Sequence, residues 1–154
     1  MRISVFGLGY VGAVSAACLS DGGHTVIGVD PQQAKVDAIN AGRSPVVERD
    51  VERLTGAGRA AGRLSATTDA AAAVRVSDVA LVCVGTPSQA NGDLDRTYLE
   101  RVCNDIGTAL RDDDRYFVVV VRSTLLPGTT RGLVIPVLER ASGRRVGHDL
   151  GVCV

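Results

Sequence analysis

Hydrophobic residues along the chain fall into two patterns: short continuous runs, and longer stretches with helical spacing. The short runs are typical of strands that are buried on both faces of a parallel sheet. We expect six strands, at residues 2–6, 25–29, 64–68, 78–84, 116–121 and 149–154. The stretches between them predict helices at residues 13–19, 32–41, 50–61, 69–76, 96–110 and 133–141. This alternation favours right-handed crossovers, so we expect a Rossmann-type, doubly wound parallel α/β sheet of three layers with strand order 3-2-1-4-5-6.

Local signals mark where several of these elements begin and end. Gly42 is expected to stop the second helix, and Asp69 and Asp95 are each expected to cap the start of a helix. Asn91-Gly92 predicts a tight turn before the fifth helix. Pro136 lies near the middle of the last helix, which it either kinks or restarts. The apolar face of the fifth helix is expected to contain Tyr98, Leu99, Val102, Ile106 and Leu110.

The first strand leads directly into the spacing G-x-G-x-x-G, formed by Gly7, Gly9 and Gly12. In this arrangement the first glycine permits a sharp turn, the second lets the backbone approach a diphosphate, and the third lets the helix pack closely against the strand. The free amides of the first helical turn then point at the anion. A motif placed behind a strand and ahead of a helix predicts a dinucleotide site.

Asp30 stands at the end of the second strand, eighteen residues after Gly12. A carboxylate there can accept hydrogen bonds from the adenosine ribose, and it favours NAD over NADP. A 2′-phosphate about 4 Å away would cost roughly 4 kcal/mol per charge pair at an effective dielectric constant near 20, and no arginine stands beside Asp30 to offset this. Asp30 also fits the N-cap of the next helix, with Pro31 at its first position, and both roles can hold together. The only lysine, Lys35, follows closely enough for its ammonium group to reach a ribose or a phosphate.

Ligands of doubly wound sheets bind at the carboxyl ends of the strands. Besides the glycine turn, two polar segments are expected at this edge, Gly85-Thr86-Pro87 and Ser123-Thr124. Their hydroxyls, on Thr86 and Thr124, are candidate ligand contacts, although most hydroxyls in such loops only cap them. His24 and His148 precede strands and are expected at the opposite edge, where neither fits a general base. No group of His, Cys and carboxylate side chains has the spacing of a metal site.

Composition narrows the class of protein. A chain of 154 residues, with 45% hydrophobic residues and a formal net charge of zero, is expected to form one domain that does not bind nucleic acid. It contains no apolar run of the roughly 18 residues that a membrane span needs, and a cytoplasmic protein without membrane contact is expected. Four widely spaced cysteines are expected to be buried, reduced thiols: Cys18, Cys83, Cys103 and Cys153.

Several of these segments form one recognisable pattern: residues 1–12, 28–30, 44–45, 83–88, 91–95 and 121–129. Together they resemble the amino-terminal domain of the UDP-glucose/GDP-mannose dehydrogenase family. The resemblance covers essentially the full 154 residues, and it is greatest to the GDP-mannose branch of the family.

The resemblance implies an NAD-dependent dehydrogenase that oxidises a CH–OH group of a nucleotide sugar, GDP-mannose or UDP-glucose. The alcohol would pass through an aldehyde and a cysteine-bound thioester to a carboxylate, with two NAD per turnover, in alginate precursor synthesis. The resemblance also implies a homo-oligomer for the full-length enzyme. Thr124 would face the reacting carbon and help to hold a catalytic water. By position, the contacts to NAD would come from Tyr10, Val11, Asp30, Lys35, Thr86 and Thr124.

The chain departs from the family pattern in two respects. After Ser44-Pro45 the family continues toward a Glu-Pro-Gly segment, whereas this chain has Glu48-Arg49-Asp50. The family's nucleophilic cysteine, catalytic lysine and glutamate, helical dimer core and sugar-nucleotide pocket would all lie beyond Val154. We therefore expect residues 1–154 to be the NAD-binding domain of a longer enzyme, able to bind NAD but not to turn over alone. The alternative is a stand-alone NAD-binding module without chemistry.

Overall fold

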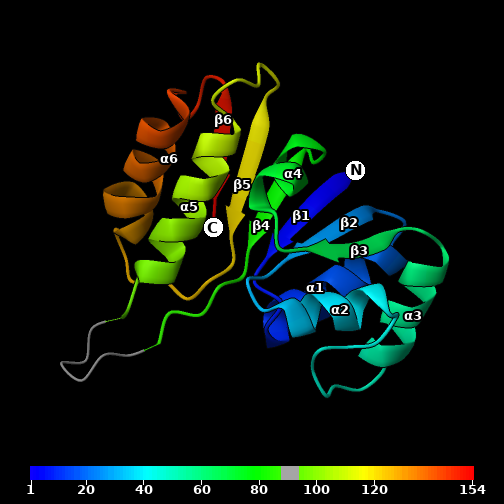
Figure 1. Cartoon of the computed structure of the whole chain (residues 1–154). Helices are drawn as coiled ribbons and strands as arrows, with labels where there is room; N and C mark the ends of the chain where they lie inside the picture. Colours follow the sequence, from blue (N-terminus) through cyan, green and yellow to red (C-terminus); the bar gives the residue numbers. More distant parts are fainter. Residues whose placement is uncertain (88–93) are drawn as a thin grey trace.

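The computed structural model describes residues 1–87 and 94–154, which form a parallel sheet between two layers of helices (Figure 1). The strand order is β3-β2-β1-β4-β5-β6, and every neighbouring pair is parallel. The predicted fold class and strand order are therefore confirmed. The predicted turn at Asn91-Gly92 lies outside the described residues. The strands are β1 (Arg2–Phe6), β2 (Thr25–Val29), β3 (Leu64–Thr67), β4 (Val79–Val82), β5 (Phe117–Val121) and β6 (Leu150–Cys153).

The helices follow the predicted alternation, with different ends. They are α1 (Tyr10–Asp21), α2 (Gln33–Asn40), α3 (Val51–Ala60), α4 (Ala70–Arg75), α5 (Thr97–Ala109), the π-helical turn η1 (Thr130–Val134) and α6 (Ile135–Ser142). Helix α1 begins three residues earlier than its apolar pattern suggested, and it therefore includes the last glycine of the motif. Helix α3 runs through Gly56 and Gly58 without a break. Gly58 is needed there, because a Cβ on it would lie 2.4 Å from the hydroxyl oxygen of Ser20 on α1.

The predicted caps had mixed outcomes. The Asp69 carboxylate accepts the N–H of Ala72 at 2.9 Å, so the cap of α4 is confirmed. Asp95 and Asp30 are not N-cap residues: α5 starts after Arg96 and α2 starts after Gln32. Each aspartate instead accepts the main-chain N–H two residues further on: Asp95 that of Thr97, the first residue of α5, and Asp30 that of Gln32, the N-cap residue of α2.

Two further helix predictions concern where helices stop and restart. Gly42 directly follows the last turn of α2 with a φ of +74°, and its N–H donates to the carbonyl of Ile39, which confirms it as the stop. Pro136 lies in the first turn of α6, directly after η1. The proline therefore restarts the helix, since its missing N–H is tolerated in a first turn.

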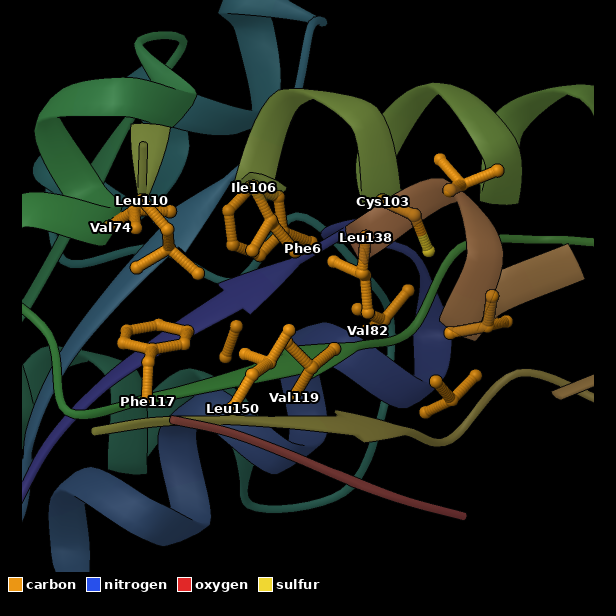
Figure 2. Packing of buried hydrophobic residues seen from close by; sticks show 14 of the residues in the cluster. Phe6, Val74, Val82, Cys103, Ile106, Leu110, Phe117, Val119, Leu138 and Leu150 are labelled. Atoms are coloured by element: carbon orange, nitrogen blue, oxygen red, sulfur yellow. The ribbon is translucent and has the colours of Figure 1, made fainter. Parts of the chain in front are cut away.

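The larger hydrophobic core lies between the sheet and helices α4, α5 and α6 (Figure 2). On α5, three of the five predicted core positions are fully buried, Leu99, Ile106 and Leu110, and Cys103 completes the stripe. Tyr98 was wrongly predicted, because 56% of it is exposed. A second cluster under α1, α2 and α3 fills the other face of β1, β2 and β3; its buried members are Ile3, Val5, Leu8, Ala16, Val26, Val36, Ile39, Leu64 and Ala66.

The cysteines are all free thiols, but the prediction that they are buried holds only for Cys103. Cys83 is half-buried, and Cys18 and Cys153 are exposed. Cys18 lies on the side of α1 that faces away from the sheet, and Cys153 ends the edge strand β6. Among the described helices, none has both the length and the apolar composition needed to cross a membrane.

Candidate functional site

The three glycines of the motif differ sharply in the space around them. Gly7 has a φ of +92°, and its N–H donates to the carbonyl of Val29 at 2.8 Å, so the chain turns at the end of β1. A Cβ on Gly12 would lie 1.8 Å from the carbonyl oxygen of Gly7, which is far inside van der Waals contact. Around Gly9, by contrast, a Cβ would meet nothing within 4 Å. Gly9 is therefore the position where the backbone lies open to a ligand.

The amino end of α1 is open to an anion. Gly9 is the N-cap residue of α1, and among the described residues no side chain caps this helix and no acidic residue occupies its first turn. Tyr10 and Val11, which begin the helix, are both exposed. Unpaired amides and the positive end of the helix dipole thus face solvent beside the glycine turn, as a diphosphate requires.

The Asp30 carboxylate connects the end of β2 to the glycine turn. It is 4% exposed, and its Oδ2 accepts the main-chain N–H of Leu8, inside the glycine motif, at 2.8 Å. The same oxygen accepts the ammonium group of Lys35 at 3.2 Å, and Oδ1 accepts the N–H of Gln32 at 2.9 Å. A carboxylate has about four acceptor positions. Roughly one therefore remains, on Oδ1, for a ribose hydroxyl.

Lys35 changes the electrostatic argument that the sequence suggested. The sequence places no arginine beside Asp30, but the structure places the ammonium group of Lys35 on the carboxylate, with the lysine side chain 27% exposed. A 2′-phosphate would therefore meet an ion pair and not an isolated negative charge. Nothing in the sequence indicated this ion pair. Asp30 follows a strand and Lys35 lies on the next helix, so the spacing of five residues does not fix the distance between their side chains.

The loops after β4 and β5 bring the two predicted threonines together. The Thr86 hydroxyl donates to the main-chain carbonyl of Thr124 at 3.0 Å. The Ser123 hydroxyl donates to the carbonyl of Val84 at 2.7 Å. Sequence reasoning placed Ser123 at this edge but gave it no partner, and it did not single out Val84, because a main-chain partner distant in the chain leaves no sequence signal. Ser123 also lines an open hollow of about 740 Å³ beside β5, whose other walls include Arg122, Leu125, Leu126 and Pro127.

The thiols and imidazoles offer little chemistry at this edge. Burial raises the pKa of the Cys83 thiol to about 11, although the nearby Arg122 acts against the shift, and burial raises the pKa of Cys103 to about 12. Both thiols therefore stay protonated at neutral pH. His24 and His148 precede β2 and β6, at the opposite edge of the sheet. In residues 1–87 and 94–154, no group of three or more His, Cys, Asp and Glu is placed to hold a metal ion.

Comparison with known proteins agrees with this geometry. Residues 1–154 match the sequence model described as UDP-glucose/GDP-mannose dehydrogenase family, NAD binding domain. The GDP-mannose 6-dehydrogenase of Pseudomonas putida is 58% identical over 154 residues, which are 100% of this chain and 35% of that enzyme.

Two solved structures are similar along nearly the whole chain. A ternary complex of GDP-mannose dehydrogenase from Pseudomonas aeruginosa superposes with a TM-score of 0.97 at 58% identity, over 99% of this chain and 35% of that one. A UDP-glucose dehydrogenase from the hyperthermophilic archaeon Pyrobaculum islandicum gives a TM-score of 0.90 at 37% identity, over 97% and 34%. The chain thus spans about a third of the length of these relatives.

Proposed function

The chain belongs to the UDP-glucose/GDP-mannose dehydrogenase family as its NAD-binding domain, and on this basis we propose that it holds the cofactor of a GDP-mannose 6-dehydrogenase. Identity supports GDP-mannose over UDP-glucose, at 58% to the P. putida enzyme against 37% to the P. islandicum enzyme. In the intact enzyme, the C6 alcohol of the sugar is oxidised in two NAD-dependent steps to the carboxylate of an alginate precursor. We place that enzyme in the cytoplasm, as a homo-oligomer.

The observation that carries the proposal is the shape of the glycine turn. Gly12 lies so close to the carbonyl of Gly7 that no side chain fits there. The space around Gly9 is empty, directly ahead of the uncapped amides of α1. This combination fits a diphosphate that approaches the main chain closely. The remaining acceptor position on Asp30 fits a hydroxyl of the adjoining ribose.

The other proposed contacts follow the same edge of the sheet. Tyr10 and Val11 flank the diphosphate, Lys35 lies on the ribose side, and Thr86 and Thr124 lie toward the reacting end. Bound NAD supplies the ring that accepts hydride from the sugar. In this proposal Thr124, three residues after the end of β5, holds the water that the last hydrolytic step consumes.

We propose further that residues 1–154 bind NAD without turning over a sugar nucleotide. A cysteine nucleophile must be present as thiolate, and the raised pKa values of Cys83 and Cys103 work against this. In this proposal the nucleophile is a cysteine supplied by another part of the enzyme.

Thermal unfolding in the presence of NAD tests the cofactor site. At a concentration 100 times its dissociation constant, NAD should add about 2.7 kcal/mol to the free energy of unfolding and raise the Tm by roughly 5 to 10 °C. No change at millimolar NAD would contradict the proposal. NADH formation by an enzyme containing this domain, with GDP-mannose and UDP-glucose compared, tests the substrate, and faster oxidation of UDP-glucose would refute the choice of GDP-mannose.

A further inference from the structure

The main-chain pairing between β4 and β5 ends before the loops that carry the proposed cofactor contacts. The register closes with Val82 opposite Val121, and the N–H of Arg122 donates to the carbonyl of Val82 at 2.8 Å. Past this point, no main-chain hydrogen bond joins the two loops in the part of the chain that the structure describes.

Two side-chain hydroxyls make that connection, in opposite directions. The β5 loop donates from Ser123 to the carbonyl of Val84 at 2.7 Å, and the β4 loop donates from Thr86 to the carbonyl of Thr124 at 3.0 Å. The Ser123 bond is the shorter one, and it is partly buried. The two loops are therefore held together as one unit at the carboxyl edge of the sheet.

Val84 also lies against the glycine turn. A Cβ on Gly7 would lie 3.2 Å from the Cα of Val84 and 3.0 Å from the carbonyl oxygen of Cys83, so this segment of main chain fills the space that a side chain on Gly7 would need. The backbone of Val84 is thus a shared support. Its Cα borders the space beside Gly7, and its carbonyl accepts the hydrogen bond of Ser123.

We propose that Ser123 is a positioning residue of the cofactor site: through Val84, its hydroxyl sets the glycine turn relative to the β5 loop that carries Thr124. This inference rests on the proposed NAD site. A site held in its binding geometry before the ligand arrives loses less conformational freedom on binding. Removing the Ser123 hydroxyl therefore weakens NAD binding, although the serine need not touch NAD.

The test compares four forms of the 154-residue chain by calorimetric titration with NAD: the unchanged chain, Ser123→Ala, Ser123→Thr and Ser77→Ala. Ser77 is the matched control, because its buried hydroxyl donates to the carbonyl of Ala73 at 2.6 Å, ahead of β4 at the opposite edge. We expect about five-fold weaker binding for Ser123→Ala, from the loss of one hydrogen bond. Ser123→Thr, which keeps the hydroxyl, should bind within two-fold of the unchanged chain. Ser77→Ala should lose thermal stability and keep its affinity for NAD.

A second measurement separates this inference from the proposed function. Amide hydrogen exchange of residues 83–86, measured without NAD, should be faster in Ser123→Ala and unchanged in Ser77→Ala. If the unchanged chain fails to bind NAD, the proposed function is refuted. The exchange data alone then show whether the Ser123 hydroxyl fixes the backbone at Val84. Unchanged exchange in Ser123→Ala, or an NAD affinity equal to that of the unchanged chain, would overturn the role of Ser123.

Discussion

The ammonium nitrogen of Lys35 lies 3.2 Å from Oδ2 of Asp30, the same oxygen that accepts the main-chain N–H of Leu8. The only lysine of the chain thus sits on the acid expected to select NAD. Because the lysine offsets part of the negative charge, we expect the preference for NAD over NADP to depend on the pair and not on the aspartate alone.

We predict that Asp30→Asn and Lys35→Met change this preference in opposite directions. Asp30→Asn removes the repulsion of a 2′-phosphate, so the NAD/NADP affinity ratio should fall about ten-fold or more. Lys35→Met leaves the carboxylate unpaired, so the ratio should rise. Titration with both cofactors measures the NAD/NADP affinity ratio. Lys35→Arg, which keeps the positive charge, should have a ratio near that of the unchanged chain. Equal ratios in all forms would leave the pair without a role in selection.

Gly9→Ala and Gly12→Ala should separate ligand approach from packing. A methyl group on Gly12 would lie 1.8 Å from the carbonyl of Gly7, so the turn must shift and the domain should lose about 3 kcal/mol of stability. Gly9 has a φ of −76° and open space, so alanine fits the fold there. Gly9→Ala should therefore leave the Tm unchanged and weaken NAD binding at least ten-fold, because its methyl group would occupy the place of the diphosphate. Strong destabilisation by Gly9→Ala would contradict these assignments.

The overall fold could be predicted because strands that are buried on both faces of a parallel sheet have nearly continuous apolar sequences. The run at Phe117–Val121 needs no knowledge of its neighbours to be recognised. Element ends were less predictable, since they depend on main-chain partners. Helix α1 starts at Tyr10, directly after Gly9, which is three residues before the apolar stretch from which it was predicted. Tyr98 and Leu99 are adjacent apolar residues, and only packing decides which one is buried.

The site was predictable where the residue type itself carries the chemistry. The glycine motif, Asp30 and the two threonines could be located from spacing and from the strand ends they follow. The bond from Ser123 to Val84 could not, because any residue at position 84 would offer the same main-chain carbonyl. Such contacts between side chain and main chain become visible only when the strands are placed side by side.

Asp50 should be a position where glycine stabilises the chain. It has a φ of +63°, the only positive value of a non-glycine residue among those described, and it stands where the resemblance to the family places the glycine of Glu-Pro-Gly. Its carboxylate is exposed, and its contacts to Arg49 and Arg53 at 3.9 and 3.7 Å contribute little. Asp50→Gly should raise the free energy of unfolding by up to about 1 kcal/mol, and Asp50→Ala should lower it by a similar amount. Urea unfolding measures both, and a glycine variant less stable than the alanine variant would contradict the expected order.

The four thiols should differ in their rates of alkylation. With iodoacetamide at pH 8, Cys18 and Cys153 should react first because they are exposed. Burial raises the pKa of Cys83 to about 11 and that of Cys103 to about 12, so Cys83 should react slowly and Cys103 only when the domain unfolds. Peptide mass spectrometry follows each site, and the chain in urea, where all four should react alike, is the control. Early labelling of Cys103 would mean that α5, which carries it, does not stay packed in the core in solution.

Asp78 should make the stability of the domain sensitive to acid. The side chain of Arg2, and then its main-chain N–H at 3.0 Å, hold the pKa of the Asp78 carboxyl down to about 2. A pKa that is lower in the folded state stabilises the fold above the ordinary value near 4, and this contribution is lost as the pH falls through about 2. Because the Asp78 side chain is 41% exposed, water and salt screen the pair, and the contribution stays well below the full shift.

Asp78→Asn should therefore lower the Tm at pH 7, and the difference from the unchanged chain should close between pH 4 and pH 2. Thermal unfolding across this range measures the gap, and 1 M salt should narrow it at pH 7, because the Debye length falls to about 3 Å. Asp114→Asn, at another exposed aspartate, is the control and should leave the Tm unchanged. A gap that persists unchanged at pH 2 would mean that Asp78 acts through its shape and hydrogen bonds, not through its charge.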